Sequence, residues 1–248
     1  MAKRLPKLVP NPRSLMKPSS ESLLSSLVSL SAKDQSKVFE QLQAHDVRAI
    51  LGELDEMYKA DPWAWFVNEV FTSDEATQSK LAWPDKAYLK DLVYLLRTEP
   101  LLFIPKSRRM MVSWLMSGWA VYNARYFPHH AIFIQSETED KASYIVDKRC
   151  KFIEDNLREP LLKRNYRAIK TNQGSVGRIT YEKTGSYIWA IAQGDDVIRS
   201  FTFSILFMDE SEFQGEGQKA FISALPTAEK GAQLVMASTS AGPQGVLA

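Results

Sequence analysis

The sequence predicts an α/β domain with a mainly parallel central sheet flanked by helices. From about residue 85, short apolar runs bounded by turns alternate with helix-like segments, which is the order expected of parallel strands joined by crossover helices. Several of these runs are almost continuously apolar, as in strands buried on both faces. The expected strands are Leu101–Ile104, Ala131–Gln135, Ile179–Glu182, Tyr187–Ala192, Ser204–Met208 and Gln233–Ala237, and the expected helices span 113–126, 138–157 and 216–224.

Two regions precede this core, which we place at 76–248. Residues 1–20 mix basic residues with prolines and are expected to form a mobile basic arm, either merely solvated or docking nucleic acid or a partner. Residues 21–75 are expected to be helical, beginning with a capping-box-like Ser31 and broken at Asp61-Pro62. Apolar residues recur at helical spacing before that break, at Val47, Ile50, Leu51, Leu54 and Tyr58, and a second helical stretch follows over 63–70.

Composition narrows the class of protein. The formal net charge of the 248 residues is only +2, so nucleic-acid binding would require a local basic patch. Cys150 is the single cysteine, which excludes an intramolecular disulfide and a cysteine-rich zinc site and favours a reducing compartment. We find neither a signal peptide nor an apolar run of membrane-spanning length. The protein is therefore expected to be soluble and intracellular, with no membrane partner.

A loop between an expected strand and an expected helix has the frame of a phosphate-binding loop. It reads Pro105-Lys106-Ser107-Arg108-Arg109-Met110-Met111-Val112-Ser113. Such a loop needs backbone N–H groups and a helix N-terminus facing the phosphates, a cation for the β- and γ-oxygens, and a hydroxyl for Mg²⁺. Lys106 could supply the ammonium and Ser113 the hydroxyl. The usual ending is Gly-Lys-Ser/Thr, whereas this loop ends Met111-Val112-Ser113 and contains no glycine; alone, it is equally compatible with a solvated basic loop.

Two further strand ends carry polar side chains. The apolar run 204–208 ends in Asp209-Glu210, the pattern of a Walker B strand, in which the aspartate holds Mg²⁺ and the glutamate activates water. Adjacent carboxylates at a buried strand end are costly unless a cation is present. The run 233–237 ends in Ser238-Thr239-Ser240, hydroxyls that could sense a γ-phosphate or could simply form a turn.

The order and spacing of these three elements resembles the large terminase subunit of tailed double-stranded DNA bacteriophages, in its N-terminal ATPase domain. Lys106-Ser107-Arg108-Arg109 is similar to the family's loops in which lysine comes first, and Val197-Ile198-Arg199-Ser200 resembles its Val-Arg-Gly segment. Ile134-Gln135-Ser136 and Asp140-Lys141-Ala142 add agreement, so that the resemblance covers roughly 60–245. It implies a RecA-like (ASCE) P-loop NTPase fold, with Ser238, Thr239 and Ser240 as the coupling motif.

The resemblance also implies a mechanism and partners. ATP and Mg²⁺ would bind at residues 106–113, with Ser113 and Asp209 on the metal, Lys106 on the phosphates, Glu210 activating water, and Arg108 or Arg109 stabilising charge in cis or in trans. Trp83 or Tyr88 could stack on the adenine, although the family's glutamine is absent there and either ring is equally suited to the core. The implied partners are double-stranded DNA bound without sequence preference, the small terminase subunit, the portal protein of the procapsid, and other copies of the chain in a ring.

Some alternatives stay open at the level of sequence. The chain could be another RecA-like DNA helicase or translocase, or a degenerate, non-hydrolysing NTPase fold serving as a DNA-binding or assembly module. Candidate DNA-contacting patches are Lys148/Arg149/Lys151 and Lys163/Arg164/Arg167/Lys170, each of which could be only a solvated face. Family members generally continue into a nuclease domain, so we expect this chain to be part of a longer protein and predict no nuclease activity for it.

Overall fold

A computed structural model describes residues 44–74, 76, 77, 79–158, 166–171, 174–194, 198, 202–215 and 217–239, with side chains from residue 52 onward. The expected basic arm and the helix start at Ser31 lie outside these residues, as do Ser240 and most of the Val197–Ser200 segment. Among the described helices, none combines the length and the apolar character needed to span a membrane.

The centre of the structure is a seven-stranded sheet in the order β3-β9-β8-β4-β7-β6-β5. The first five strands in that order pair in parallel, and β6 runs antiparallel to both of its neighbours. The sheet is therefore mainly parallel, as the sequence predicted. Its strands are β3 (Leu101–Pro105), β4 (Ala131–Gln135), β5 (Tyr166–Lys170), β6 (Val176–Tyr181), β7 (Tyr187–Ile191), β8 (Ile205–Asp209) and β9 (Gln233–Ser238).

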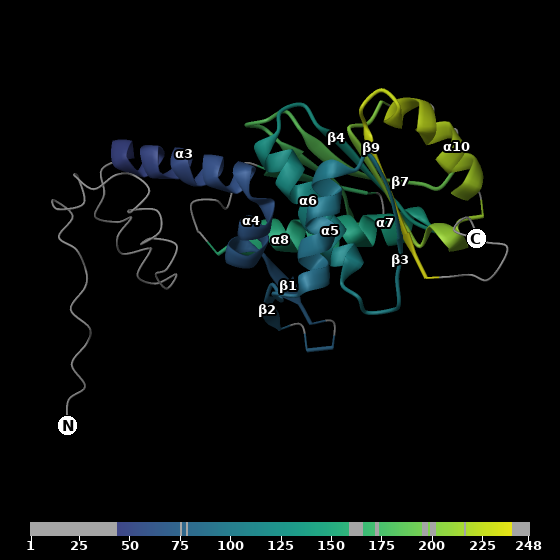
Figure 1. The fold of residues 1–248 in the computed structure, drawn as a ribbon, viewed down its shortest axis with the longest axis horizontal. Helices are drawn as coiled ribbons and strands as arrows, with labels where there is room; N and C mark the ends of the chain where they lie inside the picture. The colour runs from purple at the N-terminus through teal and green to yellow at the C-terminus, as the bar shows by residue number, and fades with distance from the viewer. Residues whose placement is uncertain are drawn as a thin grey trace.

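Helices cover both faces of this sheet (Figure 1). The described helices of the domain are α5 (Ala87–Thr98), α6 (Val112–Tyr126), α7 (Glu139–Ile145), the π-helix η1 (Val146–Cys150), α8 (Lys151–Asn156), the 3-10 helix η2 (Ser211–Phe213) and α10 (Gly217–Ala228). Because successive side chains of a strand point to opposite faces, Ile132 and Ile134 of β4 join a core with α5 to α8, while Phe133 joins a second core with α10.

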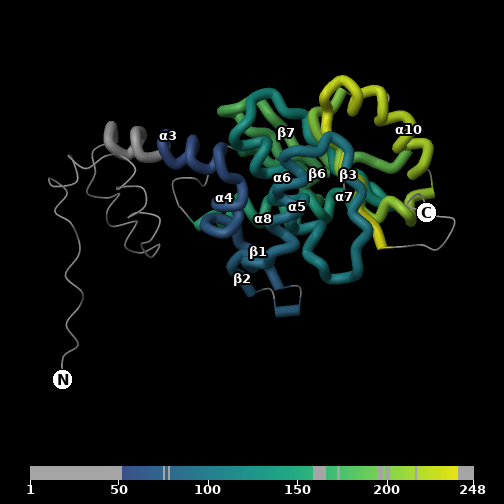
Figure 2. The backbone as a smooth tube through the Cα atoms, viewed as in Figure 1, coloured from purple at the N-terminus to yellow at the C-terminus, as the bar shows by residue number. Residues whose placement is uncertain are grey.

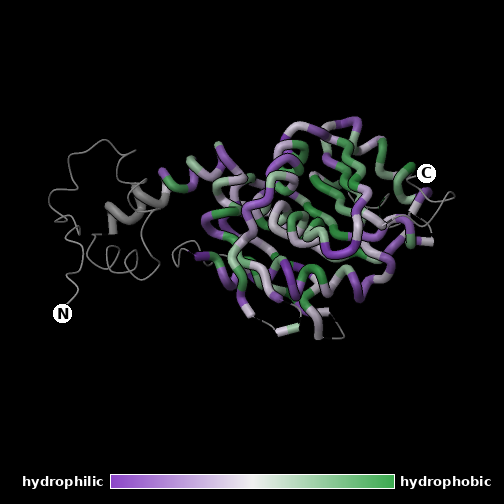
Figure 3. The backbone as a smooth tube through the Cα atoms, turned by 60° about the horizontal axis from the view of Figure 1, so that its bottom comes forward, coloured by the Kyte–Doolittle hydropathy of each residue, from purple (hydrophilic) through white to green (hydrophobic). Residues whose placement is uncertain are grey.

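Apolar segments concentrate on the strands and on the inner sides of the helices (Figure 3). Helix α6 is the most buried of them, because its residues lie against the sheet and against the N-terminal helices. Gly118 permits this packing, since a Cβ there would lie 2.3 Å from Cε1 of Phe66. The helix that presents Ser113 is thus held firmly in the core.

The N-terminal helices α3 (Ala44–Ala60) and α4 (Pro62–Glu69) lie to one side of the sheet, at the end opposite to α10 (Figure 2). The predicted break at Asp61-Pro62 has a clear cause. Asp61 caps α4 by accepting a hydrogen bond from the backbone N–H of Ala64 at 3.1 Å, and Pro62 occupies the first turn, where a missing N–H costs nothing. Trp65 and Phe66 are fully buried and belong to the same core as residues of α5 and α6.

Four elements were not predicted. Helix α5 and strand β5 were missed, as was the small antiparallel pair of β1 (Phe71–Ser73) and β2 (Lys80–Ala82). Strand β5 is an edge strand with exposed Arg167 and Lys170, so that its sequence carries little of the apolar pattern from which the other strands were predicted.

Candidate nucleotide site

The three polar strand ends meet at one edge of the sheet. Strand β9 lies between β3 and β8, with Pro105 opposite Ser238 and Asp209 opposite Ala237. All three strands are parallel, so the residues that follow them leave the sheet together, at the carboxyl edge where open α/β sheets bind ligands.

Lys106 connects these strand ends. Its backbone N–H donates to the carbonyl oxygen of Ser238 at 2.9 Å. Its ammonium donates to Oε1 of Glu210 at 2.6 Å and lies 3.8 Å from Oδ1 of Asp209. The side chain is only 9% exposed, so the ammonium is held against both carboxylates instead of extending into solvent.

Asp209 is a buried carboxylate of which one oxygen accepts no hydrogen bond. Oδ2 accepts a hydrogen bond from Oγ of Ser113 at 2.9 Å, whereas Oδ1 is buried and accepts no hydrogen bond. Burial raises the pKa of Asp209, and the nearby charge of Lys106 and the Ser113 hydrogen bond only partly offset that effect. A cation beside Oδ1 would favour the ionised form of this carboxyl.

These residues fit a Mg²⁺ site of the kind that is completed by substrate phosphates. Among the described residues no three His, Cys, Asp or Glu side chains gather into a metal cluster. Mg²⁺ in ATPase sites is held by one or two protein oxygens together with phosphate oxygens and water. The hydroxyl of Ser113 and Oδ1 of Asp209 would provide those protein oxygens.

Glu210 is fixed on three sides. Its backbone is left-handed, with φ of 50°, a conformation that a non-glycine residue adopts at a cost and that recurs at functional sites. Besides the ion pair with Lys106, Oε2 lies 3.5 Å from both Oγ of Ser238 and the backbone N–H of Thr239. Partial burial acts to raise the pKa of Glu210, but the hydrogen bond and charge of Lys106 outweigh it, so the pKa is lowered and the side chain is ionised.

The loop between β3 and α6 exposes Ser107, Arg108, Arg109 and Met110 to solvent. Met111, at the position where the usual phosphate loop has its last glycine, has φ of 56°, and Arg109 has φ of 65°. The loop thus keeps a left-handed backbone without glycine. Tyr88 lies against it and donates its hydroxyl to the carbonyl oxygen of Met110 at 3.3 Å.

The left-handed backbone at Met111 gives a stability prediction. The free energy of unfolding should be about 1–2 kcal/mol larger for a Met111→Gly variant than for Met111→Val. The reason is that β-branched residues are disfavoured at positive φ, whereas glycine is not. Both substitutions shorten the side chain, and valine keeps more apolar contact, so packing alone favours the opposite order. Urea unfolding curves of the pair measure the difference, and equal or reversed stabilities would contradict the assigned backbone.

The other predicted site residues fall in different places. Trp83 is a correction: its ring is 4% exposed and packs on Phe66 with centroids 4.7 Å apart, so its faces belong to the core and are closed to an adenine. Val112 is buried at the start of α6, and Ser238 is buried at the end of β9, where Oγ accepts a hydrogen bond from the N–H of Glu212 at 3.2 Å. One contributor was missed: the side-chain amide of Gln214 donates to the carbonyl oxygen of Asp209 at 3.0 Å, and no sequence signal marked it.

The two predicted basic patches differ from simple cationic surfaces. Lys148 pairs with Asp147 at 3.0 Å, and Lys151 pairs with Asp155, so the first patch is largely charge-compensated. Of the second patch, Arg167 and Lys170 are exposed on β5, and Lys163 and Arg164 lie outside the described residues.

Comparison with known proteins gives a match in structure alone. No family model and no curated protein matches the sequence. The structure is similar to the large terminase of bacteriophage HK97, with a TM-score of 0.55, 15% identity, and coverage of 73% of this chain and 38% of that chain. Weaker likenesses are to the large terminase of a thermophilic bacteriophage in complex with ADP (0.48, 16% identity, 62% and 39% covered) and to the large terminase ATPase domain of Thermus phage P74-26 (0.45, 13%, 61% and 64%).

The chain therefore has the α/β fold of a phage large terminase, with a mainly parallel central sheet flanked by helices as the sequence predicted. It spans 38% of the length of the HK97 protein.

Proposed function

We propose that this chain is an ATPase whose hydrolysis of Mg·ATP moves double-stranded DNA into a viral procapsid. The observation that carries the proposal is a chain of contacts at the carboxyl ends of β3 and β8: Lys106 pairs with Glu210 and Asp209, and Asp209 accepts a hydrogen bond from Ser113. One cation, one Mg²⁺-ligating hydroxyl and two carboxylates are the side chains that this reaction requires.

Each of these residues has a part in the proposed reaction. Lys106, which pairs with Glu210 in this structure, moves to the β- and γ-phosphates and leaves Glu210 free to accept a proton. Glu210 orients a water whose oxygen bonds to the γ-phosphorus while the bond from that phosphorus to the bridging oxygen breaks. ADP leaves with the electron pair, and the proton of the water passes to Glu210. Bound Mg²⁺ would neutralise phosphate charge and orient the triphosphate.

The surrounding residues supply positive charge and a route for coupling. Arg108 and Arg109 are exposed on the loop, where each can serve its own site or that of a neighbouring copy. Ser238 and Thr239 hold Glu210 from the end of β9, so a change at Glu210 also changes the hydrogen bonds of that strand. We propose that this link couples hydrolysis to movement, in a ring of copies that binds the portal protein, the small terminase subunit and DNA phosphates without sequence preference.

An Asp209→Asn variant tests the nucleotide site. We expect the parent to bind Mg·ATPγS, and the variant to lose at least about 10-fold in affinity when Mg²⁺ is present, because a neutral amide is a poor ligand for Mg²⁺. Folding raises the pKa of Asp209. At pH values above the folded-state pKa, the ionised carboxylate therefore lowers the free energy of unfolding. The variant without nucleotide should therefore melt at the parental temperature or higher.

Calorimetric titration and thermal unfolding measure the two quantities. Asp91→Asn, which changes an exposed carboxylate on α5, is the matched control and should behave like the parent. Parental affinity of Asp209→Asn for Mg·ATPγS would remove the proposed metal site.

A further inference from the structure

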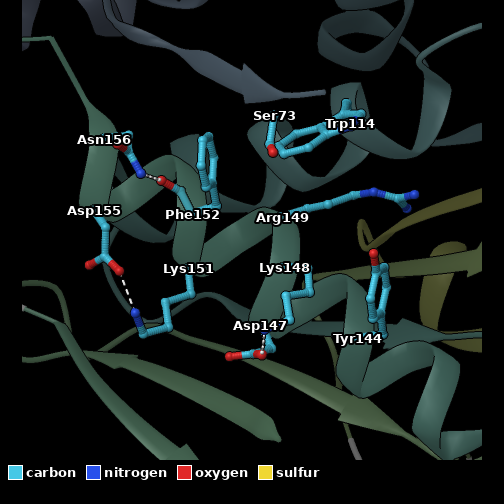
Figure 4. Close-up of a pocket in the computed structure, with 10 residues that line it drawn as sticks. All are labelled: Ser73, Trp114, Tyr144, Asp147, Lys148, Arg149, Lys151, Phe152, Asp155 and Asn156. Atoms are coloured by element: carbon cyan, nitrogen blue, oxygen red, sulfur yellow. Dashed lines mark hydrogen bonds and ion pairs between the residues drawn. The ribbon is translucent and has the colours of Figure 1, made fainter. Parts of the chain in front are cut away.

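A cleft of about 520 Å³ opens beside the start of α6, one residue beyond Ser113. Its wall combines Trp114 of α6 and Tyr144 of α7 with residues of η1 and α8, among them Arg149 and Phe152 (Figure 4). The cleft and the candidate nucleotide site therefore each include a residue from the first turn of α6.

Arg149 lies at the side of the cleft formed by Trp114 and Tyr144. Its guanidinium carbon is 5.9 Å from the centroid of the Trp114 ring. In Figure 4 the side chain extends toward these two rings and away from the Lys148–Asp147 and Lys151–Asp155 ion pairs. An arginine on an aromatic face keeps its charge while it is partly withdrawn from water.

The backbone that carries Arg149 is fixed to the helix that carries Ser113. The thiol of the next residue, Cys150, is fully buried and donates to the carbonyl oxygen of Ser117 at 3.8 Å. Ser117 in turn donates its hydroxyl to the carbonyl oxygen of Ser113 at 2.7 Å. The segment is also a π-helix, a rare form that recurs at functional sites. The backbone at Arg149 is thus anchored to the first turns of α6.

The position of Arg149 is therefore set from the helix that carries Ser113. Its guanidinium lies against Trp114, the residue that follows Ser113 in the first turn of α6.

We propose that Arg149 is a further catalytic residue of the nucleotide site: supplied by the same chain, it moves from the Trp114 ring to the γ-phosphate and stabilises the negative charge that develops during transfer. The inference rests on the proposed function. It assigns to η1 a role in catalysis, in place of the DNA contact that the sequence suggested for this basic cluster.

The test compares Arg149→Gln with Lys148→Gln, a neighbouring cation whose partner is Asp147. For Arg149→Gln we expect kcat for ATP to fall about 10²–10³-fold with a small change in KM, as when one transition-state donor is removed. Mg·ADP with aluminium fluoride, which mimics the transferring phosphoryl group, should bind at least about 10-fold more weakly, whereas Mg·ADP alone should bind within about 3-fold of the parent. Lys148→Gln should match the parent in all of these measurements.

Trp114 provides a readout that does not depend on turnover. Mg·ATPγS should change the tryptophan emission of the parent as Arg149 leaves the ring, and most of that change should vanish in both Arg149→Gln and Trp114→Phe. If Arg149→Gln lowers the melting temperature, Arg149→Lys gives the measurement, because lysine lacks the planar fork that contacts two phosphate oxygens.

The outcomes separate this inference from the proposed function. The role of Arg149 alone would be overturned by one combination of results. In it, the folded Arg149 variant keeps the parental kcat and the parental affinity for the aluminium fluoride complex, while Lys106→Ala and Glu210→Gln are inactive. Full activity of Lys106→Ala and Glu210→Gln would overturn the site itself.

Discussion

Glu210→Gln should hydrolyse ATP about 10²–10⁴-fold more slowly than the parent, the range for loss of a general base. Glutamine has almost the same shape and can still accept the hydrogen bond from Lys106, but it cannot take the proton of the attacking water. The lowered pKa of Glu210 means that the parental side chain is ionised, and therefore competent to receive that proton, at neutral pH.

Nucleotide binding should survive this substitution. Glu210 holds the ammonium of Lys106 at 2.6 Å, and a neutral partner releases that ammonium more readily to the phosphates. Affinity for Mg·ATPγS should thus equal or exceed that of the parent. A phosphate-release assay and a titration measure the two effects. Glu212→Gln, two residues along the chain, is the control, and an undiminished rate for Glu210→Gln would show that another group activates water.

Lys106→Ala should lose nucleotide affinity rather than turnover alone. A hydrogen bond to a charged group contributes about 1.5–3 kcal/mol, which corresponds to a loss of about 10- to 100-fold in affinity for Mg·ATPγS. The two carboxylates also lose their common cation, so the pKa of both Asp209 and Glu210 should rise, since Lys106 lowers each in the parent.

The control for this variant is Lys183→Ala. Lys183 is 70% exposed and pairs with Asp55, far along the chain from the strand ends, and its removal should leave affinity unchanged. Parental affinity of Lys106→Ala would place the phosphate-binding cation elsewhere, and the 106–111 loop would then be only a basic surface loop.

The sequence predicted the sheet well because its buried strands are apolar on both faces. Runs such as 205–208 admit few other structures, and the polar residues that end them mark the carboxyl edge of the sheet. Parallel pairing then brings 106, 209–210 and 238 together without any further information. The sequence did not predict strand β5 or helix α5, because neither contributes a continuous apolar run. Strand β5 is an exposed edge strand, and α5 buries only Leu89, Val93 and Leu96.

Details of the site depend on backbone geometry that residue types do not encode. The loop was questionable in sequence because it lacks glycine, yet Met111 adopts the left-handed conformation that glycine usually provides. Trp83 and Tyr88 were equivalent candidates in sequence; the structure buries the first against Phe66 and places the second on the loop. Arg149 lies beside Trp114 on a π-helical turn anchored by the Cys150–Ser117 contact, and neither feature has a sequence pattern.

A crystal structure of the chain with Mg·ATPγS tests the central claim most directly. It should show the ammonium of Lys106 withdrawn from Glu210 and about 2.7–2.9 Å from a phosphate oxygen, with Mg²⁺ about 2.0–2.1 Å from an oxygen of Ser113 or Asp209. A nucleotide bound away from the ends of β3 and β8, with the Lys106–Glu210 ion pair unchanged, would contradict it.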